Sequence, residues 1–337
     1  MRTDRPIALC VGEVLFDAIE MRDARGRVIG APRISAGGAP ANTAIALRKL
    51  GAASAFAGCI AEDAAGDELL TLLRAAGVDV RGVQRTREAP TRIVRTACDA
   101  RGERTFLDFG GAPADAFADA LLEAEALPQG LLAGVGLVVV GSLSQAYPRS
   151  RTAIMRILRD ARERAIPVFL DVNRRPLFWP DADAPREYET TRALVSLAAY
   201  LKASDEEARW LFHTSRTEDI ARIAPWLRAG IVVTDGSREI KYRINGVLGT
   251  LLPPRITAVD TTGAGDAFTA GWIARLLAGI GDDATAASAV EIMSYAAIVG
   301  ALATAGIGAW SALPTHAQVE AFLAERGGRG DDGWLSP

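Results

Sequence analysis

The sequence predicts an α/β protein with a mainly parallel central sheet, helices on both faces of that sheet, and a small β-sheet lid. Short apolar runs alternate along the chain with longer runs of helical periodicity, which is the order of a parallel sheet with crossover helices. The short runs are apolar along their whole length, so these strands are expected to be buried on both faces. Two other segments, 15–35 and 91–110, alternate between polar and apolar residues and predict half-exposed strands.

The elements of the main sheet can be assigned in chain order. The apolar run over 7–11 predicts the first strand. The other predictions are strands over 54–60, 136–142, 166–173, 198–204 and 230–236, and helices over 41–52, 65–78, 150–165 and 205–212. A β-branched strand is expected over 255–259, followed by a glycine turn and a helix over 267–280.

The two period-two segments each contain a "DARG" turn, at 23–26 and 99–102, so each predicts a hairpin. Two hairpins inserted at different points of the chain can pair into one small sheet over the ligand edge of the main sheet. The alternative is that they are edge strands of the main sheet. The predicted division is a core of 1–13, 37–88 and 112–325, a discontinuous lid of 14–36 and 89–111, and a frayed tail of 326–337.

Composition excludes several classes of protein. The chain has 337 residues, 49% of them hydrophobic and 23% charged, with a formal net charge of −3, which favours a globular protein and argues against a nucleic-acid partner. Its three cysteines are far apart and lack metal-ligand spacing, so we expect no disulfide framework, no zinc and a reducing cytoplasm. The first apolar run is too short for a signal peptide or a membrane span, so no membrane partner is expected.

The stretch "DTTGAGDAF", over 260–268, has the features of an anion site at a helix start. The first amides of a helix lack intrahelical partners, and Gly263 and Gly265 let the backbone approach an anion closely. A nucleotide-binding lysine motif is absent, and Phe268 stands where a dinucleotide fingerprint needs a small residue. Because a carboxylate repels a resting anion, Asp266 suggests a proton acceptor for phosphoryl transfer. The alternative is that Asp266 only caps the helix.

A second glycine pair, Gly37 and Gly38, precedes the helix expected over 41–52. Asn42 lies in the first turn of this helix, and Glu13 and Asp17 follow the first strand at its carboxyl end, where open α/β sheets bind ligands. Carboxylates and amides are suitable partners of sugar hydroxyls, so these residues predict a polyol site. The alternative for Asn42 is again a helix cap.

These residues carry a resemblance to a known family. The segments "GGAPANTAIALRKLG" and "DTTGAGDAFTAGW" resemble the two signatures of the ribokinase-like, or PfkB, sugar kinases, and the likeness extends to the closing "GIGAWSALPT". The resemblance implies a ribokinase-like three-layer α/β/α sandwich with a β-lid. It also implies transfer of the ATP γ-phosphoryl group to a sugar hydroxyl with Mg²⁺, often with K⁺, and a homodimer formed through the lids.

The resemblance also implies roles for individual residues. Asp266 would be the catalytic base, with Gly263, Ala264 and Gly265 as the anion hole. The sugar-binding set would be Asp17, Gly37, Gly38 and Asn42, with Phe106 and Arg104 from the lid. For Phe106, the alternative is packing within the lid.

The segment "DVNRRPLFW" resembles a pattern of fructokinases and 2-keto-3-deoxygluconate kinases. It implies that Asp171, Asn173, Arg175 and Trp179 lie between sugar and phosphates, where Arg175 would neutralise phosphate charge.

The segment "LKASDEEARWLF" resembles the K-x-N-x-x-E segment of the family. Lys202 would lie near the phosphates and Glu207 would organise water around Mg²⁺, whereas Ser204 replaces the family's Asn. The alternative for this acidic run is a solvated helix start.

The remaining nucleotide-side residues show two departures from the family. Thr234 and Gly236 would border ATP, but Glu239 replaces a frequent glycine, and Ala297 replaces an asparagine near the adenine. Both departures predict a loosened preference for adenine. Asp260, with the backbone of Thr262, Ala305 and Gly308, would form the K⁺ site, although an Asp before two threonines also caps turns.

The substrate prediction is fructose. "GEVLFD", "GGAPAN" and "DVNRRPLFW" look most like bacterial fructokinases, and Asp108 in the lid would repel the carboxylate of a sugar acid. A 2-keto-3-deoxygluconate kinase and a ribokinase are the alternatives within the family. From other classes, we consider a non-catalytic module that binds sugar or nucleotide, and a dinucleotide-dependent oxidoreductase.

Overall fold

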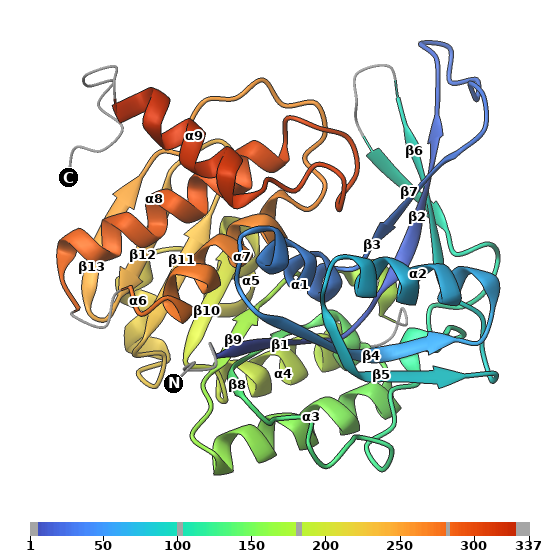
Figure 1. Cartoon of the computed structure of the whole chain (residues 1–337), viewed down its shortest axis with the longest axis horizontal. Helices are drawn as coiled ribbons and strands as arrows, with labels where there is room; N and C mark the ends of the chain where they lie inside the picture. Colours follow the sequence, from blue (N-terminus) through green and yellow to red (C-terminus); the bar gives the residue numbers. More distant parts are fainter. Residues whose placement is uncertain (1–5, 100–103, 180–183, 281–283, 328–337) are drawn as a thin grey trace.

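The protein consists of a central sheet covered by helices on both faces, with an arm of four strands that projects to the upper right in Figure 1. The structure is a computed structural model that describes residues 6–99, 104–179, 184–280 and 284–327, and all statements below concern these residues. The strands are β1 (Ile7–Val11), β2 (Leu15–Met21), β3 (Arg33–Gly37), β4 (Ser54–Ala61), β5 (Asp79–Thr86), β6 (Ile93–Cys98), β7 (Arg104–Asp108), β8 (Val135–Gly141), β9 (Val168–Asp171), β10 (Tyr200–Ser204), β11 (Gly230–Thr234), β12 (Ile240–Ile244) and β13 (Val247–Leu251).

The main sheet has nine strands in the order β13-β12-β11-β10-β9-β8-β1-β4-β5. All pairings from β5 to β11 are parallel, and only the β11–β12 and β12–β13 pairs at one edge are antiparallel. The carboxyl ends of the parallel strands therefore meet at one edge, where Asp171, Ser204 and Thr234 end β9, β10 and β11. This confirms the predicted mainly parallel sheet.

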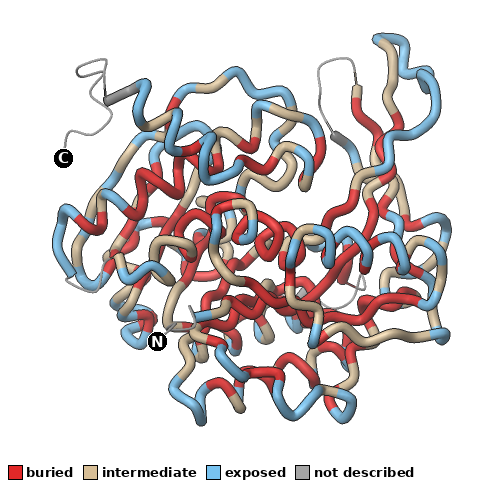
Figure 2. The backbone as a smooth tube through the Cα atoms, in the orientation of Figure 1, coloured by how far each residue is buried: buried red, intermediate tan, exposed pale blue. Residues whose placement is uncertain are grey.

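Two hydrophobic cores hold the layers together, one on each face of the sheet. The helices are α1 (Ala39–Lys49), α2 (Ala64–Ala75), α3 (Pro148–Glu163), α4 (Ala184–Val195), α5 (Asp205–Phe212), α6 (Thr217–Ile223), α7 (Ala264–Leu277), α8 (Ala286–Ala303) and α9 (His316–Gly327). Helices α1, α2, α7, α8 and α9 supply side chains to one core, and α3, α4, α5 and α6 supply the other. Figure 2 shows the buried residues concentrated in this body and the outer part of the arm exposed.

Helix α8 is strongly apolar because it is a core helix. Among the described helices it alone is long and apolar enough, by length and composition, to cross a membrane, yet 67% of it is buried inside the fold. Its buried side chains include Ile292, Met293 and Ile298, which belong to the core shared with α1 and α7. Core packing therefore accounts for the composition of this helix.

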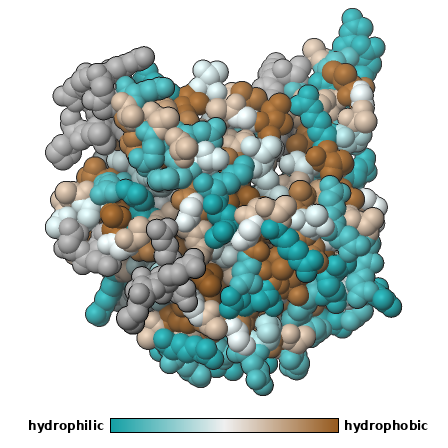
Figure 3. All heavy atoms as spheres, in the orientation of Figure 1, coloured by the Kyte–Doolittle hydropathy of each residue, from teal (hydrophilic) through white to brown (hydrophobic). Residues whose placement is uncertain are grey.

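The arm is a separate four-stranded sheet in the order β3-β2-β6-β7. Two antiparallel pairs, β2–β3 and β6–β7, are joined by the parallel β2–β6 pair, so two hairpins distant in sequence form one sheet as predicted. In the first turn, the Asp23 carboxylate accepts hydrogen bonds from the amides of Arg25 and Arg27 at 2.9 Å. The tip of this hairpin is hydrophilic in Figure 3. Most of the second turn lies outside the described residues.

One predicted strand is wrong, because residues 255–259 form no strand. The amides of Val259 and Asp260 donate to the carbonyl of Thr304 at 2.8 and 3.2 Å, so this part of the segment is bound to the end of α8 instead of a neighbouring strand. A β-branched run forms a strand only where a sheet edge offers a partner. The strands β5, β12 and β13 were not predicted.

Candidate active site

The helix start singled out in the sequence lies at the amino end of α7. Gly263 is the N-cap residue, with φ of 77°, and no side chain caps this helix. The amide of Ala264 donates to Thr261 at 3.2 Å, whereas the Gly265 amide has no acceptor within the described protein. The capping alternative for Asp266 is therefore wrong, and the Gly265 amide is available to an anion.

The Asp266 carboxylate is bound by the helix that follows the other glycine pair. Nδ2 of Asn42 donates to Oδ2 of Asp266 at 2.7 Å, and Nε1 of Trp310 donates to Oδ1 of Asn42 at 2.6 Å. Asn42 does not cap α1, because the N-cap residue Gly38 has no side-chain partner there and the Asn42 side chain is used elsewhere. The two glycine segments of the sequence therefore meet at Asp266.

The environment of Asp266 raises the pKa of its carboxyl into the neutral range. Burial and, after it, the nearby carboxylate of Asp171 raise the pKa of its carboxyl, which comes to about 7. The hydrogen bond from Asn42 and the charges of Lys202 and Arg175 oppose this rise. A pKa close to the working pH is what general-base catalysis requires.

A buried ion pair lies beside the first turn of α7. Nζ of Lys202 lies 3.0 Å from both carboxylate oxygens of Asp171, and Oγ1 of Thr269 donates to Oδ2 of Asp171 at 2.7 Å. Burial lowers the pKa of Lys202, but the carboxylates of Asp171, Glu207 and Asp266 outweigh burial and raise it, so the ammonium stays charged. A Cβ at Gly265 would lie 2.9 Å from Nζ, so the cation is adjacent to the helix start.

The Glu207 carboxylate joins two strand ends. Its Oε1 accepts from the amide of Arg174 at 2.6 Å, and its Oε2 accepts from the amide of Ser204 at 2.7 Å. Oγ of Ser204 accepts from the Glu207 amide at 3.2 Å, which completes a capping box at the start of α5. Glu207 is thus a fixed carboxylate at the sheet edge, not a freely solvated one.

Asp260 ties the turn before α7 to the segment after α8. Its Oδ1 accepts from the amide of Thr262 and its Oδ2 from the amide of Gly308, both at 3.0 Å. The predicted turn contact is therefore present. No group of three or more His, Cys, Asp or Glu side chains gathers as a metal site in the part of the chain that the structure describes.

Asp17 and the glycine pair lie where the arm joins the body. A Cβ at Gly37 would lie 2.7 Å from Oδ2 of Asp17, so this carboxylate faces the turn into α1. Gly38 has φ of 101°, and a Cβ there would lie 2.6 Å from the Glu13 carbonyl oxygen, so only glycine fits. Glu13 is buried and accepts from the Ala39 amide at 3.1 Å.

Aromatic side chains pack beneath the arm. Phe106 lies 4.9 Å from Phe109 between ring centroids, which agrees with the packing alternative for this residue. Trp179 is buried in the same cluster of apolar residues. The side chain of Arg104 lies outside the described residues.

Residues after β9 and β11 take up positions at the same edge of the sheet. Asn173 has φ of 42°, and Arg175 is exposed and close enough to influence the pKa of Asp266. Thr234 is the register partner of Ser204, and Gly236 follows with φ of 56°.

Ala297 is buried in the core, and Glu239 lines a pocket of about 510 Å³ between β12, β13 and α8.

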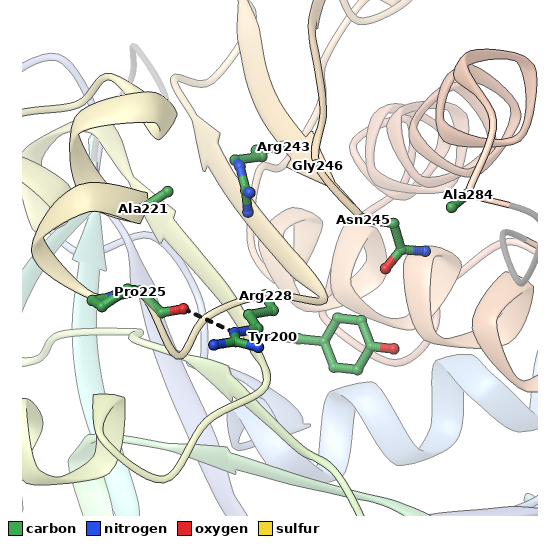
Figure 4. Close-up of a pocket in the computed structure, with 8 residues that line it drawn as sticks. All are labelled: Tyr200, Ala221, Pro225, Arg228, Arg243, Asn245, Gly246 and Ala284. Carbon is green, nitrogen blue, oxygen red and sulfur yellow. Dashed lines mark hydrogen bonds between the residues drawn. The ribbon is translucent and has the colours of Figure 1, made fainter.

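The pocket in Figure 4 is not part of this site. It has a volume of about 760 Å³ and lies at the amino ends of β10 and β11, opposite the edge with Ser204 and Thr234. Its lining residues are Tyr200, Ala221, Pro225, Arg228, Arg243, Asn245, Gly246 and Ala284.

Sequence reasoning missed a buried arginine at the base of the arm. Arg92 is 1% exposed and binds both carboxylate oxygens of Asp119 at 2.7 and 2.8 Å. Its guanidinium also lies 4.5 Å from the ring centroid of Phe117 and 3.1 Å from the hydroxyl of Tyr147. In the sequence, Arg92 looks like any polar residue of a half-exposed strand.

The positions of Thr269 and Trp310 were missed for the same reason, because no local pattern marks them.

Comparison with known proteins assigns the class that this fold defines. A family model described as pfkB family carbohydrate kinase matches residues 7–316, so the protein is a carbohydrate kinase. More particularly, the chain belongs to the pfkB family, which confirms the resemblance of its two glycine segments.

Individual relatives agree with this assignment. A probable fructokinase-4 of Arabidopsis thaliana is 30% identical over 95% of this chain and 97% of its own length. The crystal structure of fructokinase with bound ATP from Xylella fastidiosa has a TM-score of 0.83 at 29% identity, covering 96% of this chain and 99% of that one. A double mutant of fructokinase from Vibrio cholerae O395, in fructose, ADP and potassium ion bound form, has a TM-score of 0.78 at 26% identity, covering 95% and 98%.

Proposed function

We propose that this protein is an ATP-dependent fructokinase that converts fructose to fructose 6-phosphate. The observation that carries the proposal is the Asp266 carboxylate, which is bound by Asn42 and has a pKa raised by burial to about 7 beside the available amide of Gly265. The choice of ATP and fructose is supported by the relatives, which are fructokinases, one of them with bound ATP.

The proposed reaction uses Asp266 as the general base. Asp266 accepts the proton of the sugar hydroxyl while that oxygen forms a bond to the γ-phosphorus of ATP. The bond from this phosphorus to the bridging oxygen breaks, and its electron pair leaves with ADP. The amides of Gly263, Ala264 and Gly265 form the proposed anion hole, in which the Gly265 N–H has no acceptor among the described residues.

Lys202 is proposed to stabilise charge on the transferring group. Its ammonium lies next to Gly265 and is kept in place by Asp171, which in turn accepts from Thr269. Asp171 therefore supports the site through Lys202 rather than as an exposed sugar ligand. Arg175, which is exposed on the Asp266 side, adds a second cation for phosphate in transit.

The sugar is proposed to lie between the arm and the start of α1. Asp17 offers a carboxylate beside Gly37 and Gly38, and Asn42 and Asn173 offer amides. Phe106 and Arg104 would cover the sugar from the arm.

The nucleotide is proposed to lie beyond β10 and β11. Ser204 and Thr234 end these strands, Gly236 follows β11, and Glu239 lines the 510 Å³ pocket nearby. With Glu239 and Ala297 at base-side positions, a loosened preference for adenine remains part of the proposal.

The metal ions of the proposal fit the residues present to different degrees. Both carboxylate oxygens of Glu207 accept hydrogen bonds from backbone amides, so Glu207 would hold Mg²⁺ through water. This suits Mg²⁺, which keeps several of its waters and binds phosphates directly. When bound, Mg²⁺ neutralises phosphate charge. K⁺ is proposed at Asp260 and the neighbouring carbonyls, because Asp260 already organises this turn.

A homodimer and a cytoplasmic location are proposed from the exposed residues of the arm and from the cysteines. Val28, Ile29, Ile34 and Ile93 of the arm are exposed, which supports a homodimer formed through the lids. Cys10, Cys59 and Cys98 are free and buried, as suits a protein of the reducing cytoplasm.

An acceptor panel tests the proposal. The protein is incubated with ATP and Mg²⁺ and with fructose, 2-keto-3-deoxygluconate, ribose or nucleosides, and ADP release is followed. Fructose is expected to give the highest kcat/KM. A higher value with the sugar acid would replace fructose as the substrate, and no ADP release with any acceptor would overturn the kinase proposal in favour of a binding module.

A further inference from the structure

A chain of two hydrogen bonds connects a tryptophan near the end of the protein to the proposed catalytic base. Trp310 donates through Nε1 to Oδ1 of Asn42, and Asn42 donates through Nδ2 to Oδ2 of Asp266. Both bonds are short, at 2.6 and 2.7 Å, and their partners are 268 and 224 residues apart in sequence. All three groups are at least partly buried, so water competes little for these bonds.

The chemistry of the indole group determines the direction of this chain. An indole N–H can only donate, so the atom of Asn42 that faces Trp310 must be the carbonyl oxygen. The amide group of Asn42 then has to present its NH₂ to Asp266. In the flipped orientation, the NH₂ would face the indole N–H, and an oxygen would face the carboxylate. Trp310 therefore selects the one orientation in which Asn42 can hold the base.

The consequence for Asp266 is an asymmetric carboxylate. Oδ2 is engaged by Asn42, whereas Oδ1 has no protein donor within the described residues. A proton taken from a sugar hydroxyl would then go to Oδ1, because Oδ2 already accepts a hydrogen bond.

We propose that Trp310 is a positioning residue for phosphoryl transfer: it orients Asn42, which holds Oδ2 of Asp266 and leaves Oδ1 to accept the substrate proton. This inference rests on the proposed role of Asp266 as the base. The indole N–H of Trp310 donates to Asn42 and not to the base itself, so its effect on Asp266 passes through Asn42.

The loop that carries Trp310 is anchored by contacts other than the indole hydrogen bond. Nζ of Lys49 donates to the backbone carbonyls of Trp310 and Leu313 at 2.7 and 3.0 Å, so this loop is anchored without the indole N–H. Removing the N–H while keeping an aromatic ring should therefore leave the loop in place. The substitution Trp310→Phe makes that change.

A second tryptophan provides a matched control. Nε1 of Trp226 donates to the Val195 carbonyl at 2.7 Å, and neither residue belongs to the proposed site. Trp226→Phe thus removes one indole hydrogen bond of similar length elsewhere in the same fold.

The test compares kcat, KM and the pH profile of the two variants with those of the wild-type enzyme. Trp310→Phe is expected to lower kcat by roughly 5- to 50-fold and to leave the KM values within about two-fold of the wild type. A larger effect on kcat than on KM is typical of a group that acts on the transition state. The acid limb of its profile should move to higher pH, because the hydrogen bond from Asn42 lowers the pKa of Asp266. The other charged groups around Asp266, namely Asp171, Lys202 and Arg175, are unchanged. Trp226→Phe should match the wild type in every respect.

Two further variants make the outcome unambiguous. Trp310→His keeps a ring N–H and should recover part of the lost kcat, which a purely structural role would not predict. In Asp266→Asn, adding Trp310→Phe should cost nothing more, because both act on one proton transfer. Wild-type kcat and an unshifted pH profile in Trp310→Phe would overturn the inference. High turnover in Asp266→Asn would instead overturn the base itself, so the two failures are distinguishable.

Discussion

The ammonium of Lys202 lies so close to Gly265 that a methyl group at position 265 would stand 2.9 Å from Nζ. This contact brings a buried cation to the helix start, where the Gly265 amide has no acceptor in the part of the chain that the structure describes. The glycine therefore has a second function besides exposing its backbone: it makes room for the charge.

Gly265→Ala should lower activity without disturbing the fold. The methyl group would displace the end of a flexible side chain, so the protein should remain folded, but Lys202 would move away from the phosphoryl path. We expect kcat to fall roughly 10- to 100-fold. Gly130→Ala, at a glycine with no neighbour within 4 Å of an added Cβ, is the control. Steady-state kinetics with both variants checks this, and equal kcat values would contradict it.

Asp266→Asn should abolish most of the turnover while leaving binding intact. The amide keeps the shape of the carboxylate and can still accept from Asn42, but it cannot take a proton. We expect kcat to fall by about 10²- to 10⁴-fold, the usual share of general-base catalysis, with sugar and ATP affinity within a few-fold. Isothermal titration and initial rates measure the two quantities separately. Near-normal turnover would show that Asp266 is not the base.

The same substitution should stabilise the protein at alkaline pH. Burial raises the pKa of Asp266 in the folded state to about 7, whereas an unfolded Asp titrates near 3.9. Between these values the folded state binds more protons, so stability falls as pH rises through this window. Asp266→Asn removes that loss and should gain roughly 1–3 kcal/mol at pH 8 and less at pH 5. Urea unfolding at both values checks the sign, and an equal gain at both would refute it.

Arg92 is expected to contribute strongly to the stability of the fold at the base of the arm. Arg92→Met would leave the Asp119 carboxylate, 3% exposed, without its cation, which costs about 3–5 kcal/mol. Arg95→Ala, which removes more exposed ion pairs to Glu20 and Asp108, should cost much less, because solvent screens these charges. Adding Asp119→Leu to Arg92→Met should recover much of the loss. Denaturant melts test this series, and a loss below that of Arg95→Ala would contradict it.

The arm is expected to close on sugar binding. Phosphoryl transfer requires that water be kept from the base and the γ-phosphate, and the four-stranded sheet beside Asp17 is placed to exclude it. Crystals without sugar, with fructose, and with fructose plus a nonhydrolysable ATP analogue should show successive closure. Identical arm positions in all three would rule it out.

Local patterns in the sequence predicted most of the fold and part of the site. Whole-length apolar runs marked β1, β4, β8 and β11, and period-two alternation marked the arm. The run over 255–259 failed because strand propensity needs a partner, and its backbone binds Thr304 instead. The strand β12 was missed because Lys241 and Arg243 interrupt its apolar residues, and the edge strand β13 because Gly249 and Thr250 interrupt its short apolar run.

What the sequence determined by itself was the set of local elements, the two glycine turns and Asp266, because periodicity and backbone freedom depend on near neighbours. The tertiary structure alone decided what surrounds Asp266: Asn42 from α1, the Lys202–Asp171 pair and Trp310. It also decided that Arg92 is buried against Asp119. These contacts depend on the order of strands in the sheet, which brings side chains from distant segments together at one edge, and no local pattern encodes that order.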